Sequence, residues 1–178
     1  MEELRILAIN PGSTSTKIAV FSGANPVFVR TISHSTEELS KYDKITDQYN
    51  FRKEIIYKQL EEAGIEMDSI RAVVGRGGLT KPIPSGVYEV NETMKNDMVN
   101  SPMGEHASNL GGLIADDIAR SLRGHLLPIL WLWMNWNPMP VFQVTRSFSV
   151  NPSFMRSTRK QQPVSMPNRS CCAMKTST

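Results

Sequence analysis

The acidic residues and the glycines of this 178-residue chain stop well before its end. All 17 Asp and Glu lie at or before Asp117, and the last Gly is Gly124. Residues 1–122 carry 13 Lys and Arg against those 17 acids, a formal charge of −4, whereas residues 123–178 carry seven Lys and Arg and no acid, a charge of +7. Globular sequences mix both signs of charge and use about 7% Gly. The chain is therefore predicted to divide into a domain, 1–122, and an irregular, disordered basic tail, 123–178.

The first 122 residues show the periodicities of a mixed α/β domain. Three short apolar runs separated by turn residues predict an antiparallel meander, and later segments with helical spacing alternate with a further strand. Gly64 ends one of these helices, and Pro82 and Pro84 predict an extended, turn-rich segment. The expected strands are Leu4–Ile9, Lys17–Phe21, Val27–Ile32 and Ile70–Val74, and the expected helices are Tyr49–Ala63, Glu92–Val99 and Ala107–Leu122.

Composition argues against several classes of protein. The chain opens with the acidic Met1-Glu2-Glu3, unlike a secretory signal, and its apolar run Leu126–Met134 is too short to cross a bilayer. The basic residues of the tail are scattered, and its Trp-rich cluster lacks the pattern of a base-stacking surface. We therefore expect a cytoplasmic protein that binds neither membrane nor nucleic acid.

The stretch "INPGSTSTK", Ile9 to Lys17, has the physical properties of an anion-binding turn. It is not a P-loop, because no second Gly precedes Lys17 and a strand follows it. Gly12 nevertheless allows close backbone approach, and successive backbone N–H groups in a tight turn bind anions. Ser13 and Ser15 add hydroxyl donors. On these residues alone the stretch is either a phosphate-holding turn or an ordinary polar hairpin loop.

Two further positions are candidates for contacts with an anion. Arg76 follows a predicted strand within a Gly-rich segment, where its guanidinium could fork onto a carboxylate or phosphate. His106 precedes a predicted helix and could contact a phosphoryl group. Both patterns also fit purely structural roles. Arg76 could be a surface arginine between turn glycines, and His106 could be a histidine in the cap region of a helix.

Taken together and in this order, three segments resemble one family. They are "RILAINPGSTSTKIAVF", "AVVGRGGLTKPIPSGVYEVN" and "SPMGEHASNLGGLIADDIA", and they span residues 4–119. They resemble the amino-terminal half of a butyrate kinase, within the acetokinase family, whose fold is shared with actin, heat-shock chaperones and sugar kinases. The resemblance implies an actin-like, ribonuclease H-like domain with a mixed sheet and flanking helices. The turn and the "GRGGL" and "KPIPSGVY" segments point to the butyrate branch of the family.

The resemblance implies an ATP-dependent phosphotransferase that converts butyrate and ATP to butyryl phosphate and ADP. Its members use Mg²⁺ and are homo-oligomers. The resemblance matches Asn10 to a Mg²⁺-associated asparagine of the family, and it places the substrate carboxylate near Arg76. An acetate or propionate kinase, and a non-enzymatic anion-binding fragment, stay open as alternatives. The remaining matched positions are Gly12, Ser13, Ser15 and Lys17 in a phosphate-facing turn, and His106 with Asn109 beside the phosphoryl group.

The resemblance fades after Leu122, and the genetic code suggests why. One permitted codon spelling of residues 129–136, read one base earlier, encodes Asp-Pro-Val-Val-Val-Asp-Glu-Leu. In the same register, residues 142–147 can encode Ile-Ser-Gly-His-Pro-Phe, and residues 150–158 can encode Arg-Lys-Ser-Ile-Phe-His-Ala-Leu-Asn. All three strings resemble the family in the family's order. We therefore interpret the tail as a frameshifted translation that lacks the nucleotide-binding half, and we expect this chain to be inactive alone.

The frameshift hypothesis predicts a one-base loss or a two-base gain in the coding sequence. The break falls between Ala119 and Pro128, where the resemblance ends. Sequencing the source gene across codons 115–130 checks this, and an intact frame coding for this tail would refute it.

Overall fold

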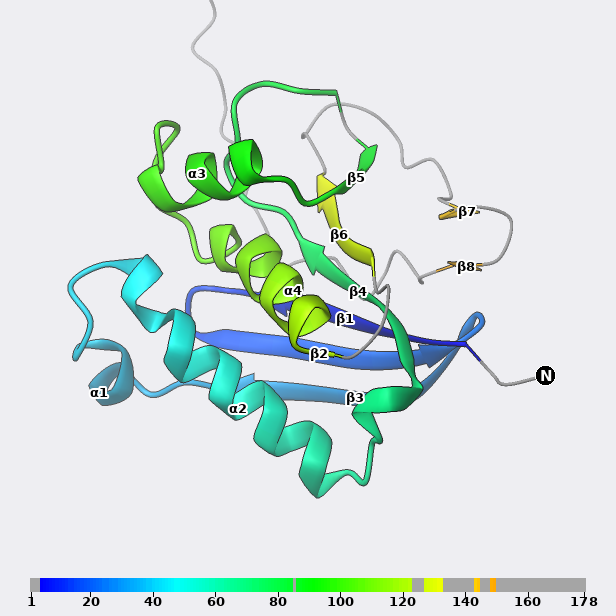
Figure 1. The fold of residues 1–178 in the computed structure, drawn as a ribbon. Coiled ribbons are helices and arrows are strands. Elements are labelled where there is room, and N and C mark those ends of the chain that lie inside the picture. The colour runs from blue at the N-terminus through cyan, green and yellow to red at the C-terminus, as the bar shows by residue number, and fades with distance from the viewer. Residues whose placement is uncertain (1–3, 85, 123–126, 133–142, 145–147, 150–178) are drawn as a thin grey trace, which may run out of the picture.

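The computed structural model describes residues 4–84, 86–122, 127–132, 143–144 and 148–149. Six strands form one mixed sheet in the order β3-β2-β1-β4-β6-β5, with helices packed against it (Figure 1). A separate pair, β7 and β8, joins Gln143–Val144 to Phe148–Ser149. The strands of the main sheet are β1 (Arg5–Pro11), β2 (Ser15–Ser22), β3 (Asn25–Ser33), β4 (Ile70–Arg76), β5 (Gly86–Glu89) and β6 (Leu127–Leu132). The helices are α1 (Thr36–Leu39), α2 (Tyr49–Glu62), α3 (Glu92–Asn100) and α4 (Asn109–Ser121), with short 3₁₀ turns η1 (Ile45–Gln48) and η2 (Met67–Ser69).

Strands β1, β2 and β3 form the predicted antiparallel meander. Gly23, at φ 57°, makes the tight β2–β3 turn, a backbone region that glycine adopts without strain. Strand β1 continues through Pro11, beyond the predicted end at Ile9. Proline is tolerated there because the ladder to β4 has already ended at the Ile9–Gly75 pair, so no hydrogen bond to β4 is lost.

Strands β1, β4 and β6 run parallel to one another, and β5 pairs antiparallel with β6. Parallel neighbours need long crossovers, which here carry α2 between β3 and β4 and α4 before β6. The carboxyl ends of β1 and β4 therefore meet at one edge of the sheet. Loops that follow parallel strands at this edge commonly carry functional side chains.

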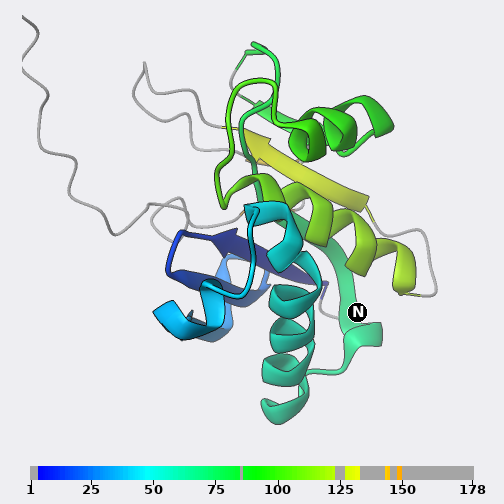
Figure 2. The same cartoon turned by 90° about the vertical axis from the view of Figure 1, so that its left-hand side faces the viewer.

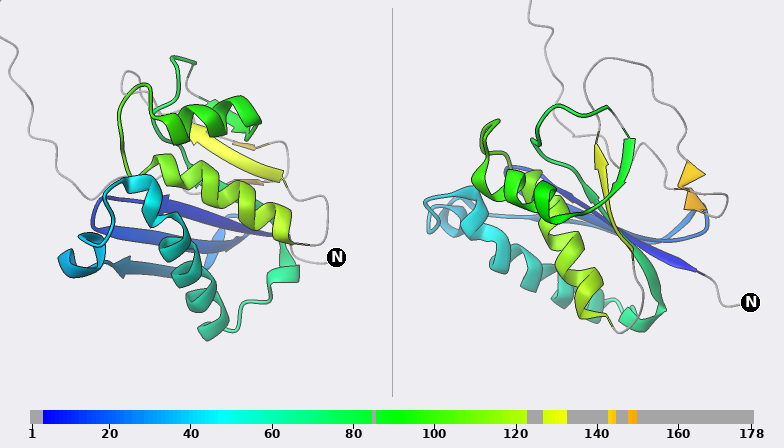
Figure 3. Two further views of the ribbon diagram at one scale, coloured as in Figure 1. Left: turned by 60° about the vertical axis from the view of Figure 1, so that its left-hand side comes forward. Right: turned by 45° about the horizontal axis from the view of Figure 1, so that its top comes forward.

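The two faces of the sheet have separate apolar clusters. One face packs against α2 and α4, and Figures 2 and 3 show both helices on this side. Its core combines alternate strand residues such as Ile9 and Ile18 with helix residues such as Ile56 and Ile114. The opposite face carries the other members of the alternation, and the period of two explains the division. They are Ile6, Ala8, Ala19, Phe21, Ala72, Val74 and Ile129.

Helix α4 lies unusually close to the end of β4. A Cβ placed on Gly75 would lie 2.1 Å from the carbonyl oxygen of Gly111, and a Cβ on Gly111 would lie 2.1 Å from the carbonyl oxygen of Arg76. No side chain fits at either position without moving backbone. The two glycines therefore fix the start of α4 directly against the carboxyl end of β4.

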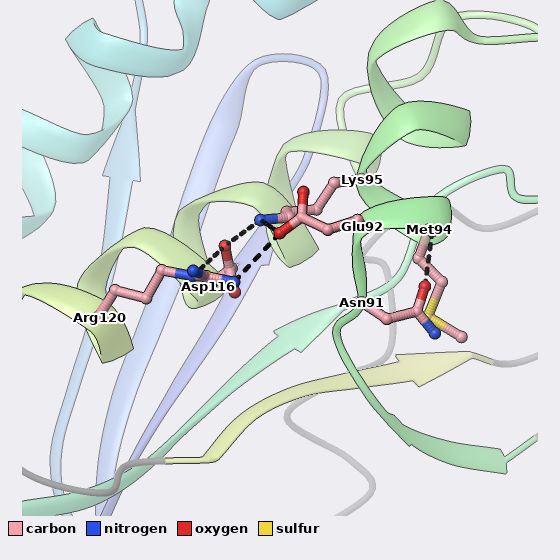
Figure 4. A network of polar contacts seen from close by, with 6 residues as sticks. All are labelled: Asn91, Glu92, Met94, Lys95, Asp116 and Arg120. Carbon is pink, nitrogen blue, oxygen red and sulfur yellow. Dashed lines mark hydrogen bonds and ion pairs between the residues drawn. The ribbon is translucent and has the colours of Figure 1, made fainter.

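A buried carboxylate joins α3 to α4 (Figure 4). Asp116 lies between two cations: Lys95 Nζ at 2.9 Å and Arg120 Nε, which donates at 2.9 Å. Glu92 binds the same pair, at 2.6 Å from Lys95 and 3.3 Å from Arg120. Asn91 caps α3 by accepting from the backbone N–H of Met94. These contacts fix α3 against α4.

The predicted α/β class, a mixed sheet with flanking helices, is confirmed, with the strand order and directions of a ribonuclease H-like sheet. Strand β5 is not among the predicted strands, because Pro82 and Pro84 indicate a turn-rich segment just before the four residues that pair with β6. Strand β6 falls inside the tail segment 123–178, and its Ile129 is buried against β4. Apart from β6, β7 and β8, that segment lies outside the described residues, so the domain boundary at 122 stays a prediction. Within the described part, no helix is long and apolar enough to span a membrane.

The close approach of α4 to β4 predicts that Gly111→Ala destabilises the domain. Alanine gains about 0.5–1 kcal/mol of helix propensity over glycine. The backbone clash should outweigh this and lower the free energy of unfolding by roughly 1–3 kcal/mol. Denaturant titration measures the change. Glu61→Ala, at an exposed position of α2, is the control for propensity alone. A Gly111→Ala variant as stable as the parent would contradict this packing.

Candidate anion-binding site

Three polar side chains meet where β1 and β4 end. Asn10 on β1 pairs with Lys17 on β2 across the hairpin, so both side chains lie on the same face of the sheet. Arg76, the last residue of β4, donates from Nη1 to Asn10 Oδ1 at 3.3 Å. Burial lowers the pKa of the Arg76 guanidinium, which stays charged. The edge thus carries two cations beside an amide.

The β1–β2 turn lies next to this cluster. Gly12 N–H donates to the Ser15 carbonyl oxygen at 2.7 Å and closes the turn. The predicted phosphate contact of Gly12 therefore cannot use this N–H without breaking that bond. Ser13 and Thr14 form the exposed tip, and neither N–H donates to a backbone carbonyl among the described residues.

Arg52 of α2 lies behind the turn with 1% of its surface exposed. Its Nη1 donates to the carbonyl oxygen of Gly12 at 2.8 Å, and its Nη2 donates to that of Ser13 at 3.2 Å. Nη1 also reaches Thr16 Oγ1 at 3.0 Å and the Ser15 carbonyl oxygen at 3.4 Å. Burial lowers the pKa of Arg52 to about 10. A charged side chain at a core position of α2 thus donates hydrogen bonds to the inward-facing carbonyl oxygens of the turn.

His34 adds a second contact to the same turn. Its backbone N–H donates to the Thr14 carbonyl oxygen at 2.9 Å, and its Nε2 lies 2.9 Å from Thr16 Oγ1. The ring is buried against Phe51, with centroids 5.4 Å apart. Burial, helped by the charge of Arg52, lowers the pKa of His34 to about 4. His34 is therefore a neutral structural support.

Asn109, the first residue of α4, is 1% exposed, and its side chain contacts backbone groups and the Ser101 hydroxyl, to which Nδ2 donates at 3.2 Å. Its Oδ1 accepts from Leu79 N–H at 2.8 Å, and its Nδ2 donates to the carbonyl oxygens of Met98 and Gly104. A Cβ on Gly78 would lie 2.2 Å from this Oδ1, so Gly78 allows the contact. Asn109 thus holds the segment after Arg76 against the start of α4, and its amide faces protein backbone.

His106 lies in the loop before α4, at the same edge as Arg76. Its Nδ1 accepts from the Ser108 backbone N–H at 3.1 Å, which puts the proton of the neutral ring on Nε2. Burial and the nearby charge of Arg76 lower the pKa of His106. The ring is therefore a neutral donor through Nε2 at neutral pH.

By themselves, the described residues do not form a complete site for a divalent ion. Asn10 Oδ1 faces the Arg76 guanidinium, and Lys17 lies opposite Asn10 on the neighbouring strand β2. Mg²⁺ prefers carboxylate oxygens and water. No group of three or more His, Cys, Asp or Glu side chains suited to a metal occurs in the described part of the chain. A Mg²⁺ contact of Asn10 stays a prediction.

The structure therefore brings most of the sequence-predicted site residues to one edge, but not all in the predicted way. Asn109 contacts backbone instead of the open edge, and no motif indicated Arg52 or His34. Arg52 could have been found from spacing, because it stands four residues before Ile56 and eight before Leu60 in the buried stripe of α2. The residues at or beside this edge are Asn10, Gly12, Ser13, Ser15, Lys17, Arg76 and His106.

By its sheet topology, the domain belongs to the mixed α/β domains with a ribonuclease H-like core. No family model matches the chain. Over 118 residues, 66% of this chain, it is 53% identical to "Butyrate kinase 1" of Clostridium acetobutylicum. Over 119 residues, 67% of this chain, it is 56% identical to a "Probable butyrate kinase" of Bacteroides thetaiotaomicron. The resemblance of its amino-terminal two-thirds to butyrate kinases is thereby confirmed.

The chain spans about one third of the length of these curated relatives, 33% of each. Among solved structures, a propionate kinase from Francisella tularensis is similar, with 16% identity and a TM-score of 0.40. The alignment covers 72% of this chain and 36% of that one.

The low pKa of His34 predicts a pH-dependent part of the stability. Between pH 6.5 and about 4 the unfolded chain protonates this histidine while the folded domain does not, so stability falls as the pH drops through this window. The loss amounts to roughly 2–3 kcal/mol. His34→Gln keeps a polar group beside Thr16 and removes the titration. Unfolding measured from pH 7 to 4 should show the parent losing more stability than His34→Gln, and parallel curves would contradict the assignment.

Proposed function

We propose that residues 4–122 form the phosphoryl- and carboxylate-binding part of an ATP-dependent carboxylate kinase, with butyrate as acceptor. The proposal is carried by one observation. The segments that match butyrate kinases at 53–56% identity are the ones whose cations gather at the β1–β4 edge. Lys17 and Arg76 would face two anionic groups that must approach each other.

In the proposed reaction a carboxylate oxygen of butyrate attacks the γ-phosphorus of ATP. A bond forms between that oxygen and phosphorus, the bond to the bridging β–γ oxygen breaks, and ADP leaves with the electron pair. Such transfers depend mainly on in-line positioning and on neutralising charge at the phosphoryl oxygens. No proton has to be removed from the acceptor, because a carboxylate is already ionised at neutral pH.

Each residue then has a defined task. Arg76 binds the acceptor carboxylate, since its planar guanidinium suits two oxygens. Lys17 and the hydroxyls of Ser13 and Ser15 bind the phosphoryl oxygens, and His106 donates to them through Nε2–H. Asn10 orients Arg76 through its 3.3 Å contact.

Asn109 has an indirect task in this scheme. Because its amide bonds hold Leu79 and Gly104, it positions the segments that carry Arg76 and His106. Its predicted phosphoryl contact is replaced by this positioning role in the proposal.

We infer that these 178 residues, taken by themselves, bind anions but do not turn over, since they match 33% of the length of the curated relatives. A non-enzymatic anion-binding fragment would bind the same anions. It would differ from an incomplete kinase in having no site for the acceptor carboxylate. Butyrate that competes with or enhances phosphoryl binding would favour the kinase.

The proposal predicts that Lys17→Ala weakens binding of butyryl phosphate to the full chain by at least about tenfold, the cost of one charge-assisted contact. Calorimetric titration measures the affinity, and circular dichroism confirms that each variant is folded. Lys41→Ala, an exposed lysine outside the site, should bind as the parent does.

Two outcomes would contradict the proposal. If Lys17→Ala and the parent bound butyryl phosphate with equal affinity, Lys17 and its turn would not be part of the binding site. In a coupled assay with butyrate and Mg-ATP, turnover near that of an intact butyrate kinase would show that the chain is not an incomplete enzyme.

A further inference from the structure

We propose that Arg52 is the positioning residue that orients the β1–β2 turn for anion binding. This inference rests on the proposed function of the turn. Arg52 itself does not reach the open edge, since it lies behind the turn among buried groups of α2. Its action therefore has to pass through the backbone.

The first step in the argument is the geometry of the peptide groups. The carbonyl oxygens of Gly12 and Ser13 both point at the Arg52 guanidinium, at 2.8 Å and 3.2 Å. In a trans peptide the N–H of the next residue points the opposite way. The N–H groups of Ser13 and Thr14 are thereby directed away from Arg52. The exposed tip of the turn presents two donors on the side opposite the buried cation.

The second step is electrostatic. Three carbonyl oxygens, those of Gly12, Ser13 and Ser15, converge on one point, and their partial negative charges would repel one another without a cation between them. Among the described residues no carboxylate lies within ion-pair distance of Arg52, so its positive charge is balanced mainly by these carbonyl oxygens. Arg52 therefore stabilises the arrangement in which the aligned peptide dipoles place their positive ends outward.

The third step is rigidity. Gln48, one turn earlier in the chain, accepts from Arg52 Nε at 3.1 Å and from Nη2 at 2.8 Å. Two bonds to one amide oxygen fix the plane of the guanidinium. Thr16 Oγ1 accepts from Nη1 at 3.0 Å on the other side. Figures 1 and 2 show the start of α2 beside the β1–β2 turn, where these contacts form. The fork is thus held before any anion arrives.

Lysine cannot reproduce this arrangement. An ammonium group is a point charge with three donors, whereas Arg52 donates from three different nitrogens in one plane. Arg52→Lys keeps the charge and loses the fork, and Arg52→Gln loses both. Lys53→Gln is the matched control, because Lys53 is the next residue on α2 and binds Asp117 at 2.7 Å, away from the turn.

The test uses the full chain and inorganic phosphate as the probe. The thermal shift that saturating phosphate produces is measured for each variant against its own phosphate-free midpoint, so that lost stability alone does not change the readout. We expect the parent and Lys53→Gln to bind alike, Arg52→Lys to bind several-fold more weakly, and Arg52→Gln to bind at least tenfold more weakly. Amide proton signals of Ser13 and Thr14 should move with phosphate in the parent and stay in place in Arg52→Lys.

The outcomes separate this inference from the proposed function. A parent chain that does not bind phosphate would overturn the proposed function and this inference together. Binding that is lost in Lys17→Ala but kept in Arg52→Gln would overturn the role of Arg52 alone. Should Arg52→Gln fail to fold, Arg52→Lys decides: the same phosphate affinity and amide shifts as the parent would overturn the proposal.

Discussion

The parallel pairing of β1 with β4 is the constraint on which the rest of the structure depends. It places Asn10 next to Arg76, although 66 residues separate them in the chain, because Ile9 and Gly75 are partners in the ladder. The antiparallel hairpin then adds Lys17 opposite Asn10. The glycine contact between Gly75 and Gly111 brings the start of α4 to the same edge. A cationic edge results from backbone pairing, with side chains supplied from segments distant in sequence.

Much of the fold could be predicted from sequence because local periodicity determines it. The three strands of the meander and helices α2 and α4 follow from apolar spacing and from turn residues such as Gly64. The partnership of β1 with β4 could not be predicted from spacing, since register between distant strands leaves no local pattern. Strand β5 was missed for a related reason: its four residues become a strand only through pairing with β6.

The candidate site divides in the same way. Its outward-facing members stand in motifs that sequence reasoning found, because Gly, Ser and Lys in a turn have a recognisable chemistry. No motif indicated Arg52 or His34, because both act from behind the turn; only the spacing of Arg52 with Ile56 and Leu60 marks its place on the buried stripe of α2. The resemblance predicts a phosphoryl contact for Asn109. In the structure its Oδ1 instead accepts from the Leu79 N–H, which the missing side chain of Gly78 allows. Strand β6 lies within the segment that composition assigned to the tail, and its place in the sheet follows from pairing with β4, which composition does not reveal.

The central claim is that the β1–β2 turn and Lys17 bind one phosphoryl group, with Arg76 beside it for the carboxylate that approaches. A crystal structure of the full chain grown with phosphate tests this most directly. The account predicts a phosphate ion within hydrogen-bond distance of the Ser13 or Thr14 amide and of Lys17 Nζ, with the Arg76 guanidinium facing it. Phosphate bound elsewhere while this edge contains only water, or a turn whose carbonyls have left Arg52, would contradict it.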